Sequence, residues 1–191
     1  GCKALIDAEP ELTRMDQIVG DGDIGRSLAG GSEALIAERD VLAQLEGAAF
    51  WRHVGAVVRR STGGTSGPLY AILAIGAANA LEGTDGDAGS LLGAAFAGGV
   101  QALQELGGAM PGDRTMVDAL VPAMNALAEA GSPAERLEAA AKAAREGAEA
   151  TRNLAARRGR SSYVGDRVIG HPDPGAVAVA IWLEAAAAST R

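Results

Sequence analysis

Long stretches rich in alanine and leucine decide the fold, and AGSLLGAAFAGGVQALQELG, residues 88–107, is representative of them. Alanine and leucine are strong helix formers, and a stretch of this length suits a helix of about four to six turns. Glycine-bearing segments, Gly83–Gly89 and Gly107–Gly112, interrupt the pattern on either side. The sequence therefore predicts a helix bounded by these two breaks.

The same pattern recurs along the whole chain. β-Branched residues cluster only in Val54–Val58 and Val177–Ile181, and both clusters lie in alanine-rich surroundings with helical periodicity. Short breaks between long helices favour antiparallel neighbours in a bundle or a closed ring. No change in composition marks a domain boundary, so we expect a single all-α domain over residues 1–191. The eight predicted helices cover residues 2–18, 26–45, 48–61, 67–82, 88–107, 114–130, 133–155 and 174–189.

Composition and charge exclude several classes of protein. The 191 residues are 48% hydrophobic, which excludes disorder, and the single cysteine, Cys2, excludes a disulfide scaffold. A net charge of −7 and an aromatic content of 3% argue against a surface for nucleic acid. The longest nearly apolar run, Pro68–Leu81, is too short to cross a membrane, and no signal peptide is visible. We expect a cytoplasmic protein that binds neither nucleic acid nor membranes.

Three aspartates are concentrated in Met15-Asp-Gln-Ile-Val-Gly-Asp-Gly-Asp-Ile-Gly25. Asp16 is expected in the last turn of the first helix, and the following glycines permit a tight turn that returns Asp21 and Asp23 toward it. Carboxylates about 4–5 Å apart repel by roughly 4 kcal/mol per pair at an effective dielectric near 20. Convergence would therefore imply a cation, and Mg²⁺ accepts carboxylates together with phosphate oxygens. The alternative is a solvated acidic turn in which Asp21 caps the next helix.

A second Asp-Gly-Asp-x-Gly string, at residues 85–89, lacks the third carboxylate. Alanine stands at the position that corresponds to Asp16, five residues before the first aspartate of the string. We therefore interpret Asp85 and Asp87 as part of an ordinary turn between helices.

The segment Ser61-Thr-Gly-Gly-Thr-Ser-Gly-Pro68 has the features of a helix start that could hold an anion. Pro68 suits the first helical position, and Thr65 or Ser66 suits the cap or the residue before it. Because glycines bare the backbone N–H groups, this helix end offers donors and a positive dipole. The alternative is a capped turn that binds nothing.

Two later segments also read as helix starts. In Met110–Asp118, Asp113 is a natural cap, and Met116 either packs in the core or covers a flat base. In the segment that ends at Gly175, Asp173 is predicted to cap a helix whose first residue is proline. The long break before it, residues 157–174, is typical of a functional loop.

Together, four segments resemble the nucleotide-binding L domain of dihydroxyacetone kinases. They occur in the family's order and span almost the whole chain. The resemblance implies an antiparallel eight-helix barrel that binds ATP or ADP at one end through Mg²⁺, with two ions expected. The segments are Asp16-x4-Asp-Gly-Asp-x-Gly, Gly63-Gly-Thr-Ser-Gly-Pro, Gly112-Asp-Arg-Thr-Met-Val-Asp, and Gly159-Arg-Ser-Ser-Tyr-x-Gly-Asp-Arg with Gly-His-Pro-Asp-Pro-Gly175.

The resemblance also assigns roles to residues. It makes Asp16, Asp21 and Asp23 the metal ligands, and Arg160 both a nucleotide contact and the predicted catalytic residue. Many relatives carry His, Thr or Cys where this chain has Ile24. The remaining nucleotide-binding positions fall into a phosphate group, an adenine group and a closing group: Ile24, Gly25, Ser27, Thr65 and Ser66; Gly107 or Gly108 with Met116; and Asp173, Pro174 and Gly175.

The activity implied by the resemblance is transfer of a phosphoryl group from ATP to dihydroxyacetone or a related short ketose. In this family the ketose is held on a separate K domain or subunit, through which a homo-oligomer can also form, so we expect activity only in its company. Two alternatives stay open. The chain could be an ADP-bearing relay subunit rephosphorylated by a phosphotransferase protein, or a helical interaction module with a vestigial site.

Overall fold

The computed structural model describes residues 1–129 and 131–190. These residues form helices joined by short connections and include no strand, so the predicted all-α class is confirmed. Their α-helices are α1 (Cys2–Asp7), α2 (Glu9–Val19), α3 (Ile24–Ala37), α4 (Arg39–Leu42), α5 (Gly47–Ser61), α6 (Ser66–Leu81), α7 (Ala88–Gly107), α8 (Val117–Leu127), α9 (Pro133–Ala150) and α10 (Pro174–Ala188). Three 3₁₀ turns lie between α9 and α10: η1 (Thr151–Asn153), η2 (Arg160–Tyr163) and η3 (Gly165–Val168).

The first two predicted helices are each divided in the structure. The first is divided at Ala8, between α1 and α2. Pro10 explains this break, because proline has no N–H and its ring collides with the carbonyl four residues earlier in a continuous helix. The second predicted helix is divided at Glu38, between α3 and α4. The predicted count of eight helices is therefore not confirmed.

Helix α8 begins at Val117, three residues after its predicted start. Arg114 has a φ of 62°, in the left-handed region, so it does not belong to the first turn of a helix. The carboxylate of Asp118 organises the preceding turn by accepting the N–H groups of Gly112 and Thr115, at 2.5 and 2.8 Å. The prediction that Asp113 caps this helix is wrong, since the N-cap residue is Met116 and no side chain makes a capping bond there.

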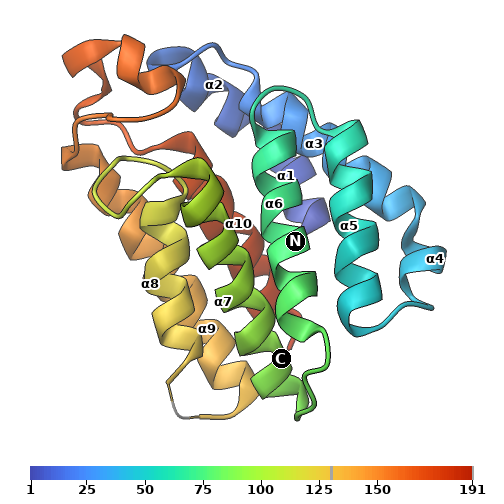
Figure 1. The fold of residues 1–191 in the computed structure, drawn as a ribbon. Coiled ribbons are helices and arrows are strands. Elements are labelled where there is room, and N and C mark those ends of the chain that lie inside the picture. Colours follow the sequence, from blue (N-terminus) through green and yellow to red (C-terminus); the bar gives the residue numbers. More distant parts are fainter. Residues whose placement is uncertain (130, 191) are drawn as a thin grey trace.

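The helices form a closed ring (Figure 1). From α5 to α10 each helix contacts the next one in sequence. The ring closes because α10 contacts α1 and α2, both of which contact α3, and α3 contacts α5. From α5 to α10 successive helices run in opposite directions, so the N-terminal ends of α6, α8 and α10 lie at the same end of the ring, at the top of Figure 1. The positive ends of these helix dipoles therefore face one region.

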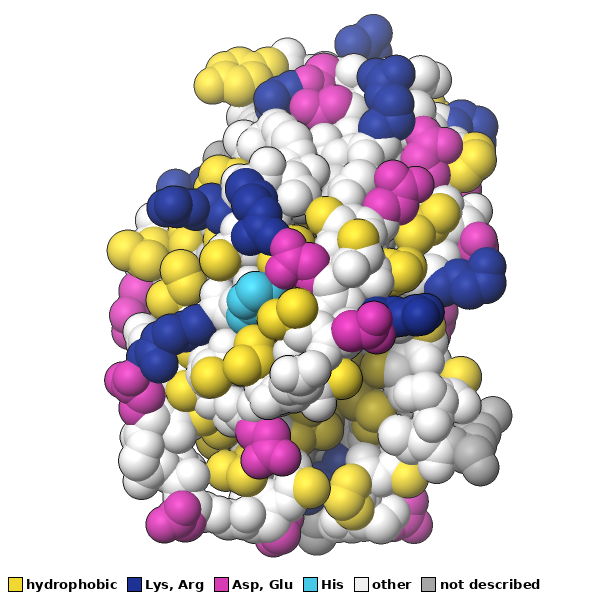
Figure 2. Space-filling model, turned by 90° about the vertical axis from the view of Figure 1, so that its right-hand side faces the viewer, with side chains coloured by type: hydrophobic (Ala, Val, Ile, Leu, Met, Phe, Trp, Pro, Cys, Tyr) yellow, Lys and Arg dark blue, Asp and Glu magenta, His cyan; other side chains and the backbone are white. Residues whose placement is uncertain are grey.

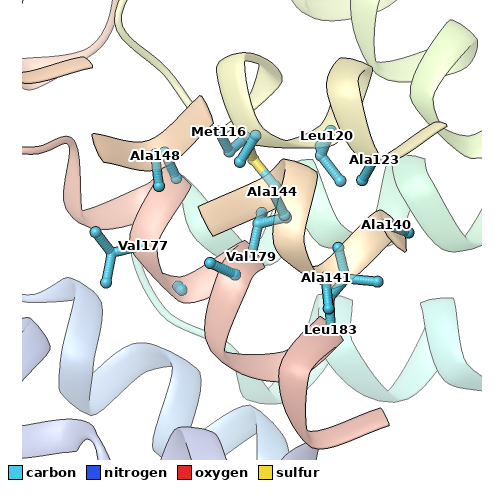
Figure 3. Close-up of a cluster of buried hydrophobic side chains, with 14 of the residues drawn as sticks. Met116, Leu120, Ala123, Ala140, Ala141, Ala144, Ala148, Val177, Val179 and Leu183 are labelled. Atoms are coloured by element: carbon cyan, nitrogen blue, oxygen red, sulfur yellow. The ribbon is translucent and has the colours of Figure 1, made fainter. Parts of the chain in front are cut away.

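Small side chains build the core between α8, α9 and α10 (Figure 3). Alanines of α9 face Leu120 of α8 and Leu183 of α10, and both leucines are almost fully buried. The helices approach closely, because a Cβ at Gly147 would collide with the backbone of Asp118. The alanine-rich sequence thus produces close helix contacts rather than bulky interdigitation.

The opposite side of the ring is hollow. An apolar cavity of about 560 Å³ lies among α3, α5, α6, α7 and α10, and Leu35, Trp51, Val58, Phe96 and Trp182 are among its lining residues. Figure 2 shows hydrophobic side chains around a depression on the face that carries α4 and α5. None of the helices described is both long and apolar enough to cross a membrane.

Candidate metal centre

Three carboxylates converge where α2 ends and α3 begins. Asp16, Asp21 and Asp23 each offer an oxygen atom, and these atoms lie within 4.8 Å of one another. No other group of three potential metal ligands was found in the part of the chain that the structure describes, so Asp85 and Asp87 do not form a second one. Asp87 instead caps α7 by accepting the N–H of Ser90 at 2.9 Å, as expected for a turn between helices.

Local backbone geometry explains the convergence. Helix α2 ends at Val19, and a Cβ on the following residue, Gly20, would collide with the carboxylate of Asp16. Gly22 has a φ of 75°, which turns the chain back toward α2. The Asp16 carboxylate accepts the N–H groups of Asp23 and Ile24 at 2.9 and 3.2 Å. Asp16 therefore joins the last turn of α2 to the first turn of α3.

The solvated-turn alternative is wrong in its capping residue. The N-cap of α3 is Asp23 rather than Asp21, and its side chain makes no capping bond. Burial raises the pKa of Asp23, the charge of Asp16 raises it further, and Arg26 lowers it. At 4.8 Å each pair of charges repels by about 3.5 kcal/mol at an effective dielectric of 20. A cation that contacts all three carboxylates would offset this repulsion.

Arg160 reaches the same three-aspartate cluster from the loop between α9 and α10. Its guanidinium contacts the Asp21 carboxylate, and its Nη1 lies 3.3 Å from Oδ2 of Asp23. These three side chains are each about two fifths exposed, so the cluster is open to solvent and to a ligand. The structure thus places the predicted catalytic residue beside the predicted metal ligands.

The glycine-rich segment before α6 forms another wall of this site. A Cβ at Gly64 would lie 2.8 Å from Oδ2 of Asp23, and a Cβ at Gly63 would lie 3.1 Å from Oγ of Ser27. Thr65 is the N-cap of α6 without a side-chain capping bond, and the first helical residue is Ser66. The glycine-rich segment thus places the start of α6 beside the aspartates, and N–H groups at a helix start that lack intrahelical acceptors can bind an anion. Pro68 occupies the third helical position, not the first as predicted.

Two of the predicted nucleotide contacts, Ile24 and Gly25, also pack against the protein. The partly buried side chain of Ile24 packs against the core cluster. A Cβ at Gly25 would lie 2.8 Å from the backbone nitrogen of Thr13 and would collide with the Glu9 carbonyl. Close approach of α3 to α2 therefore explains the glycine at this position.

The predicted adenine and closing residues lie at the end of α7, at the start of α8 and at the start of α10. Gly107 ends α7, and Gly108 follows with a φ of 63°. Met116 is 7% exposed and belongs to the core cluster, and a Cβ at Gly175 would lie 3.7 Å from the Cβ of Met116. The structure thus brings Met116 and Gly175 together, with Met116 packed mainly in the core.

Asp173 and Pro174 begin α10 as the sequence predicted. The buried Asp173 carboxylate accepts the Ala176 N–H at 2.8 Å, and Pro174 is the first helical residue. Burial raises the pKa of Asp173 to about 6; the Ala176 N–H and Arg114 oppose this rise, whereas the charges of Asp118 and Asp16 add to it. Asp173 is therefore within electrostatic range of the three-aspartate cluster.

Sequence reasoning missed four residues that organise this end of the molecule. Arg114 is buried with its donors toward the loop that carries Arg160, and Asp118 holds the turn before α8. Thr151 accepts the N–H of Asp173 at 2.7 Å, and Arg158 lies 3.6 Å from Asp113. The Asp-Arg-Thr string at residues 113–115 was visible, but the contacts of Asp113 and Arg114 with the loop reach residues about 40 to 60 positions away.

Known proteins match the chain along most of its length. Residues 18–188 match the DAK2 domain. An L-erythrulose 1-kinase of Mycolicibacterium smegmatis is 40% identical, over 94% of this chain and 32% of that protein. DhaL, the ADP-binding subunit of the PEP-dependent dihydroxyacetone kinase of Escherichia coli, is 33% identical, over 96% of this chain and 90% of the subunit.

A solved structure also matches. The dihydroxyacetone kinase of C. freundii in complex with AMP-PNP and Mg²⁺ has a TM-score of 0.76 and 31% identity, over 98% of this chain and 32% of that one. The chain spans about a third of the length of the single-chain kinases it matches. It belongs to the DAK2 domain family, and the resemblance to the L domain of dihydroxyacetone kinases is thereby confirmed.

Proposed function

We propose that this chain is the nucleotide-binding domain of a kinase for dihydroxyacetone or a related short ketose, and that residues 1–191 act as one domain. The observation that carries the proposal is the convergence of Asp16, Asp21 and Asp23 within 4.8 Å beside the N-terminus of α6. A carboxylate cluster next to helix N–H groups suits Mg²⁺ together with the phosphates of a nucleotide.

The relatives support the same ligand. The E. coli subunit is named as ADP-binding, and the C. freundii structure contains AMP-PNP and Mg²⁺. The three-carboxylate donor set of this chain fits Mg²⁺, which prefers oxygen ligands and binds through a few carboxylates plus phosphate oxygens. We propose that the site takes two ions with ATP or ADP.

The proposed mechanism is phosphoryl transfer by positioning and charge neutralisation. The chemistry that Mg²⁺ supplies when bound is neutralisation of charge on the phosphate oxygens. The three aspartates hold the metal. The N–H groups at the start of α6, with the hydroxyls of Ser27, Thr65 and Ser66, bind phosphate oxygens. Arg160 places a positive charge beside the cluster, where negative charge develops on the transferred group.

The ketose and its binding residues belong to a K domain or subunit in this proposal. The chain spans about a third of the single-chain kinases that it matches, which leaves most of each relative for other functions. On this account the chain alone binds the nucleotide and phosphorylates no ketose. The complete kinase would be cytoplasmic, with homo-oligomers formed through the K domain.

The test is a calorimetric titration of Asp21→Asn with ATP in millimolar Mg²⁺. We expect Mg²⁺-dependent ATP binding to be lost while the helical circular dichroism stays unchanged, because the substitution removes one charge from the cluster. Asp85→Asn is the matched control, since it alters the same Asp-Gly-Asp-x-Gly string outside any metal cluster described. Equal ATP affinities in the two variants would contradict the metal assignment.

A second candidate function is favoured by the E. coli relative, of which the alignment covers 90%. The chain would then keep ADP as a fixed cofactor and relay a phosphoryl group. Slow dissociation of ADP and its retention through purification would support this relay, whereas rapid exchange with ATP supports the ATP-using kinase. Absence of any ATP or ADP binding in millimolar Mg²⁺ would instead identify a vestigial site.

A further inference from the structure

We infer that Arg114 is a positioning residue, which holds the loop carrying Arg160 against the three-aspartate cluster. The inference rests on the proposed function for its consequences in nucleotide binding. That a buried guanidinium holds the loop in place follows from contacts within the chain alone.

The guanidinium of Arg114 is fully buried, unlike the arginines of ordinary surface ion pairs. Its side chain has no exposed surface, and its backbone has a φ of 62°. The Nη2 atom donates to the carbonyls of Val168 and His171, at 3.3 and 2.9 Å, and Nη1 lies 3.9 Å from Oδ1 of Asp173. Removing a guanidinium from water is costly, and so is left-handed backbone at a residue other than glycine. Among the described residues Nε and Nη1 have no hydrogen-bond partner, so the hydrogen bonds of the guanidinium go only to the returning end of one loop.

That loop, residues 152–172, is closed at its base. The N–H of Asp173 donates to Oγ1 of Thr151 at 2.7 Å. Arg152 and Gly170 are joined twice, by the Gly170 N–H to the Arg152 carbonyl at 2.8 Å and by Nη1 of Arg152 to the Gly170 carbonyl at 2.9 Å. Figure 1 shows the loop, in orange, at the end of the ring beside α2. Between these bonds the loop contains only short 3₁₀ turns, which do not fix its direction.

Two adjacent residues hold the two arms of the loop. Asp113 holds the outgoing arm: its carbonyl accepts the Arg157 N–H at 3.1 Å, and its carboxylate lies 3.6 Å from Nε of Arg158. Arg114 holds the returning arm through Val168 and His171. Arg160 lies between these two anchored arms, and the anchors keep its side chain beside the aspartates.

The consequence concerns the freedom of Arg160. Its side chain is 45% exposed, so packing alone does not immobilise it. If the returning arm is released, Arg160 must be ordered again each time the site is filled, which weakens nucleotide binding while the aspartates stay in place.

The test uses Arg114→Lys in the full chain, because lysine keeps the charge but lacks the planar fork that reaches two carbonyls and a carboxylate together. We expect trypsin to cut the loop about tenfold faster than in the unaltered chain, since loss of a charged hydrogen bond costs enough to open a loop to that degree. Arg145→Lys is the matched control, because the guanidinium of Arg145 on α9 bonds Glu184 of α10 at 2.8 and 2.6 Å and neither bond is to the loop. The loop offers trypsin Arg152 at its base and Arg157, Arg158, Arg160 and Arg167 beyond it.

A double-mutant cycle distinguishes positioning from general destabilisation. Arg114→Lys should weaken binding of ADP in millimolar Mg²⁺ about tenfold in the unaltered chain and less than twofold in the Arg160→Ala background. An equal loss in both backgrounds would overturn the inference, as would wild-type rates of loop cleavage. If Arg114→Lys does not fold, Asp113→Asn releases the outgoing arm and is read in the same way. Failure of the unaltered chain to bind ADP would refute the proposed function alone, because the cleavage rates still decide the role of Arg114.

Discussion

Gly64→Ala is expected to damage the metal centre through a single methyl group. Gly64 has a φ of 60°, and an added Cβ would lie 2.8 Å from Oδ2 and 3.3 Å from Oδ1 of Asp23. Ordinary contact begins at 3.4 Å, so the carboxylate or the glycine-rich segment must move by about 0.6 Å. Metal–ligand distances tolerate only about 0.2 Å, so the movement removes Asp23 from the coordination of a shared ion.

The effect of Gly64→Ala has two parts, the cost of left-handed backbone at alanine and the cost of the new contact with Asp23. Left-handed backbone at alanine costs roughly 1–2 kcal/mol of stability at either of two glycines, Gly64 and Gly83. Gly83 has a φ of 68°, and its Cβ would meet no atom within 4 Å. Gly83→Ala therefore carries the backbone cost without the contact. We expect both variants to lose similar stability and only Gly64→Ala to lose Mg²⁺-dependent ADP binding, by about tenfold or more.

The assay combines urea denaturation of both variants with calorimetric titration of ADP at a fixed Mg²⁺ concentration. Subtracting the Gly83→Ala result removes the backbone contribution. If Gly64→Ala bound ADP as tightly as Gly83→Ala, the positioning of Asp23 by the glycine-rich segment would be refuted.

Two further predictions concern stability. Leu120→Ala, in the core between α8, α9 and α10, should lower the free energy of unfolding by about 2–5 kcal/mol, as measured by urea denaturation; a loss below 1 kcal/mol would show that this core is loosely packed. The pKa of Asp173 is raised from 3.8 to about 6, so the protonated form is favoured in the folded state. Its contribution to stability is complete below pH 3.8 and is lost as the pH rises through 6, by about 3 kcal/mol. The difference in stability between the unaltered chain and Asp173→Asn should therefore fall from pH 4 to pH 7, and a flat difference would contradict the buried, charged state of Asp173 at neutral pH.

Local signals predicted most helix boundaries. Helix α7 has the predicted bounds, residues 88–107, because a cap and a left-handed glycine mark its ends within the sequence. The start of α10 was equally visible, since Asp173 and Pro174 supply the cap and the first residue. Pro10 was visible too, but its effect was overlooked within a helix-rich pattern. The start of α8 could not be predicted from neighbouring residues. Arg114 has left-handed backbone before this helix, and its side chain contacts residues 168–173, which are distant in sequence.

In the site, too, features set by neighbouring residues were predictable and features set by distant contacts were not. The three-aspartate cluster was predictable because its members lie within eight residues and the glycines between them allow one tight turn. The ring brings the loop between α9 and α10 and the starts of α6 and α10 to the same end of the molecule, and the sequence linked these segments only through a family resemblance. The two arms held by Asp113 and Arg114 depend on contacts across the fold, as does the apolar cavity, and neither leaves a periodic signal in the sequence.

The central claim is that the three carboxylates at the junction of α2 and α3 together bind divalent cations. Crystals of the chain grown with ADP and Mn²⁺, a stand-in for Mg²⁺, would test it through an anomalous difference map. The account predicts a Mn²⁺ peak within coordination distance of Asp16, Asp21 and Asp23, next to phosphate density at the start of α6. Nucleotide density without a Mn²⁺ peak at these carboxylates, or a peak elsewhere with the carboxylates in solvent, would contradict it.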